Sequence, residues 1–238
     1  MPSTSASELP TEDHPKRILY GRRAGPKLRP AQRRLLSEKL PEIAITLPRP
    51  GALDPADCFV SALKSFALEI GFGGGEHLAF QANRQPETGF LGVEPYTNGV
   101  ASLLGHIETS QLTNIRILQD DARLLLRVLK PGSLEQIFVL FPDPWPKSRH
   151  HKRRIVNLET VALMTRAIKP GGELCLASDD PAYIRWMFEA AMREPELTWL
   201  AERPGNWRER PVDQPMTRYE RKALAAGRPS VFLRFARI

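Results

Sequence analysis

A glycine-rich turn with acidic residues around it has the composition of a nucleoside site. The turn is Gly71 to Gly75 in LEIGFGGGE, and it follows an apolar run over 66–70. Glycines where a strand meets a helix let the backbone approach a ligand closely. The dinucleotide fingerprint GxGxxG would need its third glycine at the position of Glu76, and a carboxylate there disfavours a pyrophosphate at the helix start. The turn therefore predicts a nucleoside ligand without a phosphate nearby.

The acidic residues lie where a nucleoside needs hydrogen-bond acceptors. Glu94 ends a predicted strand about 20 residues after the turn, and a carboxylate at this place can accept from both ribose hydroxyls. Asp121 follows the next strand and could accept from an adenine amino group, or it could only cap the helix that follows. Glu69 precedes the turn. Together with Gly71 and Gly73, these acids favour S-adenosylmethionine, which has a ribose, an adenine and a positive sulfonium but no phosphate.

A second unusual stretch is FPDPWPKSRHHKRR, residues 141–154, which follows another apolar run. Its prolines stiffen a loop at the carboxyl end of a predicted strand, where substrates of open α/β sheets bind. Asp143 could hold a base by accepting from its N–H groups, or it could orient the cofactor, or do both. Lys147 and the basic side chains of 149–154 could contact phosphates. A rigid turn with a solvated basic tail is the structural alternative.

The elements that must position these residues alternate between strands and helices. Such alternation requires parallel strands with crossover helices, so we expect an α/β fold with a Rossmann-like doubly wound, mostly parallel sheet. We expect strands at 66–70, 89–94, 115–118, 134–141 and 172–178, and a terminal pair at 197–203 and 229–238. We expect helices at 75–84, 96–108, 121–130, 155–168 and 181–193, after a first helix at 31–40 that Pro41 ends.

The charge of the chain is unevenly distributed. The 238 residues carry 34 Lys and Arg against 27 Asp and Glu, a net charge of +7. Residues 15–34 hold eight basic and no acidic side chains, and residues 145–154 hold five more without an acid. Such segments suit a polyphosphate partner, although the first could also be a solvated tail. We divide the chain into a basic, mobile N-terminal arm, 1–45, and an α/β domain, 46–238.

Composition also excludes several classes of protein. No stretch approaches the roughly 18 apolar residues of a membrane helix, and the opening residues contain no apolar signal core. We therefore expect a cytoplasmic protein without a membrane partner. Cys58 and Cys175 lie far apart, and no Cys, His or carboxylate cluster has metal-ligand spacing, so we expect no disulfide and no metal.

The motifs together resemble those of the tRNA (guanine-N7)-methyltransferases, which depend on S-adenosylmethionine. The matching pieces are LEIGFGGG, GVE at 92–94, Asp-Ala at 121–122, FPDPWPKSRHHKRR, Ser-Asp at 178–179 and Thr-Arg-Tyr-Glu at 217–220. FPDPWPK followed by RHxKRR is highly specific, whereas Gly74 stands where many relatives carry Met. The resemblance implies the methyltransferase form of the doubly wound fold. It also implies methyl transfer to N7 of a guanine in the variable region of tRNA, which produces 7-methylguanosine.

The resemblance also implies residue roles. Asp143 would be the catalytic residue or a neighbour of the cofactor. The implied cofactor contacts are Glu69, Glu94 and Asp121, beside Gly71 and Gly73 of the turn. The implied substrate contacts are Lys147, Asp179, Thr217, Arg218, Tyr219 and Glu220, and the N-terminal arm would add phosphate contacts.

Two other functions stay open at this point. Asp143-Pro144-Trp145 loosely resembles the Asx-Pro-Pro-aromatic loop of methyltransferases that act on adenine or cytosine amino groups, although the second consecutive proline is missing. A non-catalytic RNA-binding protein with a Rossmann-like core is the alternative from another class. Glu76 disfavours a nicotinamide-dependent oxidoreductase, and the GxSxG and GxxxxGK[ST] motifs are absent.

Overall fold

A computed structural model describes residues 23–238 of the chain. The strands are β1 (Ser65–Ile70), β2 (Thr88–Val93), β3 (Ile115–Leu118), β4 (Leu134–Leu140), β5 (Ile168–Ser178), β6 (Leu197–Trp199) and β7 (Val231–Arg237). The helices are α1 (Pro30–Ile43), α2 (Glu76–Arg84), α3 (Thr97–Ser110), α4 (Ala122–Val128), α5 (Leu158–Ala167), α6 (Pro181–Met192), α7 (Gly205–Arg208) and α8 (Arg218–Ala225). Two 3-10 turns, η1 (Pro55–Cys58) and η2 (Ser148–Arg153), complete the elements of this part of the chain.

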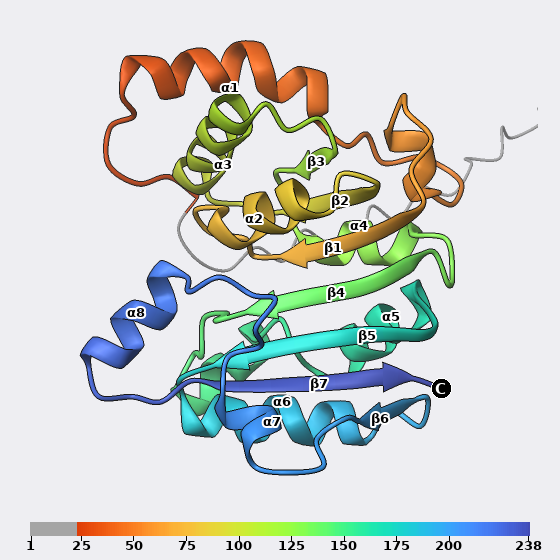
Figure 1. The fold of residues 1–238 in the computed structure, drawn as a ribbon, viewed down its shortest axis with the longest axis vertical. Helices are drawn as coiled ribbons and strands as arrows, with labels where there is room; N and C mark the ends of the chain where they lie inside the picture. Colours follow the sequence, from red (N-terminus) through yellow and green to blue (C-terminus); the bar gives the residue numbers. More distant parts are fainter. Residues whose placement is uncertain (1–22) are drawn as a thin grey trace, which may run out of the picture.

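All seven strands form one sheet in the order β3-β2-β1-β4-β5-β7-β6 (Figure 1). The first five strands are parallel, and β7 runs antiparallel between β5 and β6. This confirms the predicted doubly wound α/β fold. Because β1 pairs with both β2 and β4, the strand order reverses beside β1. Ligands of open α/β sheets bind at such a switch point, beyond the carboxyl ends of the strands.

Helices cover both faces of the sheet because alternate strand residues are apolar on both sides (Figure 1). In β1, Ala67 packs into a buried cluster with side chains of α1, α2 and α3. The next residue, Leu68, packs into the cluster that includes side chains of α4, α5 and α6. Near-continuous burial along the central strands is typical of a parallel sheet with both faces covered.

The first helix extends further than its proline suggested. Pro41 lies inside α1, which continues to Ile43. A proline in the last turn removes one helical hydrogen bond and has a suitable φ, and burial of Ile43 favours the extra turn. The helix packs against α3 (Figure 1). Between these two helices Arg34 forms a 2.6 Å ion pair with Glu108. The described part of the expected arm thus contacts the α/β body, whereas residues 1–22 lie outside the described residues.

Other boundaries also differ from the prediction. Strand β5 begins at Ile168, and β6 spans three residues. Helices α7 and α8 are not predicted from the sequence, because the segment between the last two strands is predominantly polar, although α8 itself is amphipathic. Thr217 nevertheless caps α8 by accepting from Glu220 N at 3.2 Å. In the described residues, no helix is long and apolar enough to span a membrane.

Candidate active site

A cavity of about 580 Å³ lies at the carboxyl edge of the parallel strands. Residues that follow β1, β2, β3 and β4 contribute to its wall. The lining residues that the sequence singled out are Gly71, Gly73, Glu94, Asp121, Asp143 and Tyr219. Its volume falls within the range of small-molecule sites, roughly 300 to 1,000 Å³. The topology therefore brings together most of the predicted cofactor residues.

Glu94 is held at the cavity wall by the backbone around it. Its Oε2 accepts from Gly73 N at 2.8 Å, and its Oε1 accepts from Tyr96 N at 3.0 Å. The residue is 8% exposed, and burial raises the pKa of its carboxyl; the two backbone hydrogen bonds oppose this shift. A carboxylate oxygen has more than one lone pair, so both oxygens keep acceptor capacity for a ligand.

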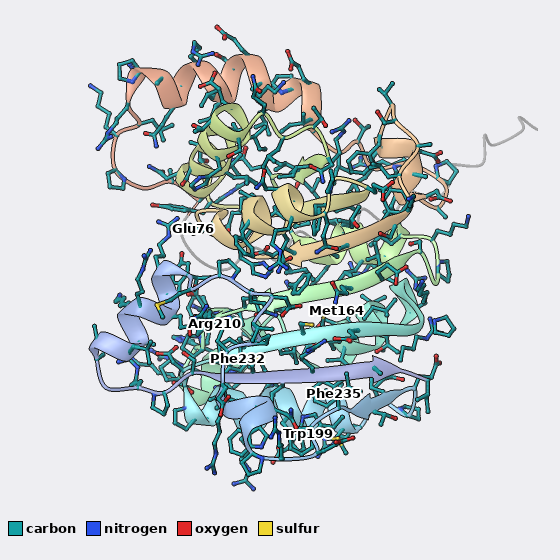
Figure 2. The ribbon with its side chains drawn as sticks, viewed as in Figure 1. Glu76, Met164, Trp199, Arg210, Phe232 and Phe235 are labelled. Carbon is teal, nitrogen blue, oxygen red and sulfur yellow. The ribbon has the colours of Figure 1, made fainter. Side chains whose placement is uncertain are left out.

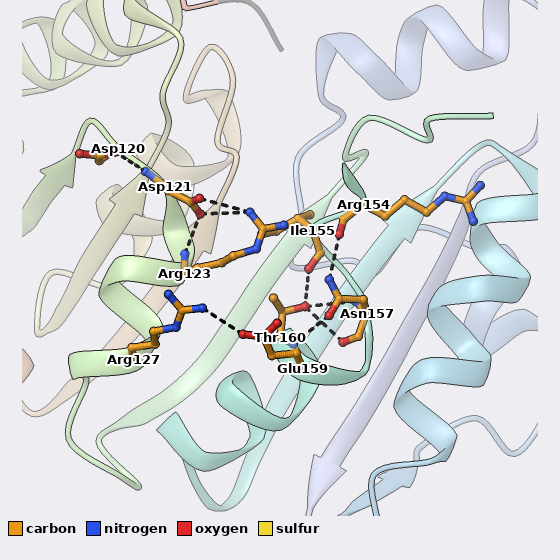
Figure 3. A network of polar contacts seen from close by, with 9 residues as sticks. All are labelled: Asp120, Asp121, Arg123, Arg127, Arg154, Ile155, Asn157, Glu159 and Thr160. Atoms are coloured by element: carbon orange, nitrogen blue, oxygen red, sulfur yellow. Dashed lines mark hydrogen bonds and ion pairs between the residues drawn. The ribbon is translucent and has the colours of Figure 1, made fainter. Parts of the chain in front are cut away.

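Asp121 uses its carboxylate within the protein. Its Oδ1 accepts from Arg123 N at 2.9 Å, and the Arg123 guanidinium lies 3.2 Å from the same oxygen (Figure 3). Asp121 N in turn donates to Asp120 Oδ1 at 2.8 Å. Asp121 thus caps α4, as the structural alternative expected, and it also lines the cavity, so both roles are compatible with its position.

Glu69 lies behind the glycine turn. Its Oε2 is 2.8 Å from His77 Nδ1, and the two residues are 3% and 2% exposed. His77 Nε2 is 3.3 Å from Gln81 Nε2, and that amide donates to Asp213 O at 2.9 Å. Glu69 lines a small pocket next to the main cavity, together with Gly71 and Tyr219. This buried pair with His77 lies directly before the turn and supports it, and the role of Glu69 as a cofactor contact stays a prediction.

The loop of Asp143 has an unusual backbone on both sides. Phe141 and Trp145 adopt left-handed conformations, with φ of 52° and 46°. Such residues cost about 1–3 kcal/mol each and persist where the surroundings hold them. Asp143 itself is open to the cavity, although the surrounding walls reduce its hydration and raise the pKa of its carboxyl. Trp145 also lines the cavity, and the Arg153 guanidinium lies 4.9 Å from its ring centroid.

Helix α8 lies beyond the carboxyl ends of the strands and contacts the glycine turn (Figure 1). A Cβ built on Gly73 would lie 2.9 Å from the Tyr219 hydroxyl, so this glycine allows the ring to approach the turn. Arg218 Nε is 2.9 Å from Glu76 Oε1, and Figure 2 shows Glu76 beside α8. A Cβ on Gly74 would lie 1.1 Å from Arg218 Nη2. Gly74 thus leaves room for the guanidinium that pairs with Glu76.

The other predicted substrate residues lie around this helix or on the surface. Lys147 is exposed, and Asp179 forms a 2.8 Å ion pair with Arg228. Thr217 lines the small pocket. Glu220 is 4% exposed, burial raises its pKa, and its Oε1 is 3.2 Å from Arg210 Nε. None of these four residues lines the main cavity.

The charge of the cavity wall favours a cationic ligand. Four acidic side chains line it against two guanidinium groups, a formal excess of two negative charges. The acidic residues are Glu94, Asp120, Asp121 and Asp143, and the basic residues are Arg123 and Arg153. Among residues 23–238 there is no group of three His, Cys, Asp or Glu side chains that could hold a metal ion.

Sequence reasoning missed several lining residues. Tyr96 follows Glu94 directly, and Ile155 follows the basic run, so neither carried a motif of its own. Arg123 could have been found as the residue after Asp121-Ala122, in the first turn of a predicted helix. Arg154 differs from the expectation for residues 149–154, because it is 2% exposed and cannot face a phosphate in solution.

Comparisons with known proteins identify methyltransferases as relatives of this chain. A family model described as "Putative methyltransferase" matches residues 64–233. A tRNA (guanine-N(7)-)-methyltransferase of Nitrobacter hamburgensis is 47% identical over 92% of this chain and 86% of that relative. One of Rhodospirillum rubrum is 45% identical over 97% of this chain and 90% of the relative.

Solved structures support the fold. The structure of an antibiotic related methyltransferase matches with a TM-score of 0.52 and 15% identity, covering 82% of this chain and 99% of that chain. An rRNA methylase from Streptococcus thermophilus also has a TM-score of 0.52, at 12% identity, over 74% of this chain and 87% of that chain. Sequence identity over nearly the whole chain, together with the cavity and the motifs around it, places this protein in the tRNA (guanine-N(7)-)-methyltransferase family.

Proposed function

We propose that this protein transfers a methyl group from S-adenosylmethionine to N7 of a guanine in the variable region of tRNA and so produces 7-methylguanosine. The observation that carries the proposal is the acidic cavity at the switch point, where Glu94 and Asp143 lie in the wall at the ends of β2 and β4. Two relatives that are 47% and 45% identical to this chain are named tRNA (guanine-N(7)-)-methyltransferase.

The residues present fit the proposed methyl donor. When bound, S-adenosylmethionine supplies an electrophilic methyl group on a positively charged sulfur. The excess of carboxylates in the cavity wall favours that charge. Glu94 keeps acceptor capacity for ribose hydroxyls while Gly73 N and Tyr96 N hold its carboxylate. The glycine turn lets the ligand approach the backbone closely.

The acceptor base requires positioning more than proton transfer. Guanine N7 has an in-plane lone pair, so no base must remove a proton before methylation. Alignment of two bound reactants can contribute about 7–11 kcal/mol to such a step. We assign Asp143 to this task, because its carboxylate opens into the cavity from a loop with a constrained backbone and can accept from the N–H groups of the guanine edge.

The exposed basic side chains beside the cavity suit the tRNA backbone. Lys147, Arg149 and Lys152 are exposed around η2, whose Arg153 lines the cavity. We assign these cations, with the basic residues of 15–34, to tRNA phosphates. The enzyme would act in the cytoplasm.

The test uses two tRNA transcripts that differ at one ring position. One contains guanosine and the other 7-deazaguanosine, in which a C–H replaces N7 while the pairing edge is unchanged. With labelled S-adenosylmethionine, we expect 7-methylguanosine after nucleoside analysis of the first transcript and no label in the second. Label on both transcripts would instead favour the amino-group methyltransferase. Binding of the tRNA with no label in either transcript would favour the non-catalytic RNA-binding protein.

A further inference from the structure

One arginine of the basic run is buried between aromatic rings. Arg154 is 2% exposed, and its guanidinium carbon lies 4.9 Å from the ring centroids of both Tyr183 and Trp186 on α6. Its Nε donates to Pro144 O at 2.8 Å. Pro144 is the residue after Asp143, so this side chain connects the Asp143 loop to a helix that follows β5.

The two rings are themselves fixed to the chain next to Arg154. The Tyr183 hydroxyl accepts from Val156 N at 3.2 Å, and Trp186 Nε1 donates to Val156 O at 2.7 Å. The Arg154 carbonyl accepts from Asn157 Nδ2 at 3.0 Å (Figure 3). The guanidinium is therefore held between two rings that are each anchored to the chain next to it, and it has little freedom to move with the loop.

The loop needs such a support because its backbone is constrained. Left-handed residues, Phe141 and Trp145, lie on both sides of the segment that carries Asp143. A conformation of this kind persists where the surrounding structure holds it. On the other side, Phe141 N donates to Ala177 O at 2.8 Å, which fixes the loop to β5. The hydrogen bond from Arg154 to Pro144 O fixes its second half.

A contribution to folding stability alone does not explain why a charged arginine is buried at position 154. Burial of an arginine is costly, and apolar residues that replace a buried charged group are often neutral or stabilising. A charged donor that is aimed at one loop carbonyl instead fixes the direction of the loop. Arg149, Lys152 and the other exposed cations of the run have no such contact with Pro144 O among the hydrogen bonds of the described residues.

We propose that Arg154 is a positioning residue that sets the place of the Asp143 carboxylate by holding Pro144 O against the rings of Tyr183 and Trp186. The inference rests on the proposed methyl transfer to guanine N7. Arg154 then has a different task from that of its exposed neighbours Arg149 and Lys152. Arg154 acts through Asp143 and contacts neither the tRNA phosphates nor the methyl donor.

The test is a double-mutant cycle between Arg154 and Asp143. Arg154→Met keeps an unbranched side chain as far as the position of Nε and removes the donor and the guanidinium. In the wild-type background we expect kcat to fall about tenfold or more, because a displacement of about 1 Å of an aligning group can cost a hundredfold. We expect the KM values for tRNA and S-adenosylmethionine to change by less than about threefold. In the Asp143→Ala background, Arg154→Met should lower kcat by less than about twofold, since residues that act as a unit are non-additive.

Arg116→Met is the matched control. Arg116 also stacks on a ring, 4.5 Å from the Phe59 centroid, and its Nε donates to Cys58 O at 2.6 Å, but it lies at the start of β3, away from the cavity. We expect this variant to change the thermal midpoint and leave kcat within about twofold of wild type. Arg154→Lys keeps the positive charge and removes the planar guanidinium group. If Arg154→Met does not fold, Arg154→Lys replaces it in the double-mutant cycle.

Two results would overturn the inference while the proposed function stands. One is a wild-type kcat in folded Arg154→Met. The other is an equal loss of kcat in both backgrounds, which would show that Arg154 acts independently of Asp143. A wild-type enzyme that produces no 7-methylguanosine would refute the proposed function itself, and this result is read before any variant.

Discussion

Removal of the Glu94 carboxylate is the sharpest test of the cofactor site. The structure predicts two separate losses, because the carboxylate holds Gly73 N and Tyr96 N and also keeps acceptor capacity for a ligand. Glu94→Ala removes both functions. Glu94→Gln keeps the shape and one carbonyl oxygen, so it retains at most one of the two backbone hydrogen bonds.

The magnitude follows from the hydrogen bonds. A hydrogen bond to a charged group contributes about 1.5–3 kcal/mol, and a buried donor left without an acceptor costs about 1–3 kcal/mol. Loss of a single ribose hydrogen bond therefore weakens S-adenosylmethionine binding by about tenfold, and loss of two weakens it by about a hundredfold or more. We expect at least a tenfold loss for Glu94→Ala and a smaller loss for Glu94→Gln.

The affinity should also depend on pH. Burial raises the pKa of Glu94 above the ordinary value of 4.5, and the nearby charges of Asp143 and Glu69 raise it further. The ionised carboxylate is the form that accepts from two hydroxyls, so affinity should fall as pH falls through this raised pKa. Stability has the opposite trend: a raised folded-state pKa means that the contribution of this group to the free energy of unfolding decreases as pH rises through it.

Calorimetric titration of S-adenosylmethionine between about pH 5 and about pH 8 measures the affinity and its dependence on pH. Wild-type affinity should decrease toward the acid end, and the decrease should be smaller in Glu94→Gln. Asp143→Asn is the control, since burial also raises the pKa of Asp143. Unchanged affinity of folded Glu94→Ala at neutral pH would refute the assignment of Glu94 as a ribose acceptor.

Three further predictions concern the acceptor base, the tRNA and helix α8. Asp143→Asn should lower single-turnover methylation by about a hundredfold and change tRNA affinity in filter binding by less than about threefold, because it alters alignment. Deletion of residues 1–22 removes three of the eight basic side chains of 15–34, so the slope of log affinity against log salt should decrease by as much as about 2 to 3. In Gly74→Ala, the new Cβ would lie 1.1 Å from Arg218 Nη2, so the guanidinium must leave Glu76. That half-exposed ion pair contributes about 0–1 kcal/mol, so urea unfolding should change little while KM for tRNA rises.

A specific result would contradict each of these three predictions. Near-normal turnover of Asp143→Asn would make the loop structural, and an unchanged salt slope after truncation would make residues 1–22 a solvated tail. Gly105→Ala is the control for the glycine variant, because a Cβ at Gly105 meets no atom within 4 Å. An equal KM for tRNA in both glycine variants would show that the Arg218 position does not matter for substrate binding.

The order of strands and motifs along the chain was enough to predict the position of the site. Apolar runs predicted five parallel strands, and residues after the ends of such strands meet at one edge of a sheet. Gly73, Glu94, Asp121 and Asp143 therefore line one cavity as expected. The segment before β7 is predominantly polar, so its amphipathic helix α8 was not predicted, and the place of α8 over the glycine turn depends on contacts between distant residues.

Packing between distant segments decided what the motifs left open. Arg154 has the same side chain as Arg153, which lines the cavity, and only the rings of α6 make Arg154 a buried donor to the Asp143 loop. Glu69 at the end of β1 is paired with His77 of α2, on the other side of the glycine turn, and the sequence did not indicate this pair. The sequence by itself determined which elements form and which ends of strands meet, because these depend on local hydrophobic periods and chain direction. The tertiary structure alone determined which charged groups are buried and paired, because desolvation depends on residues that other elements bring into contact.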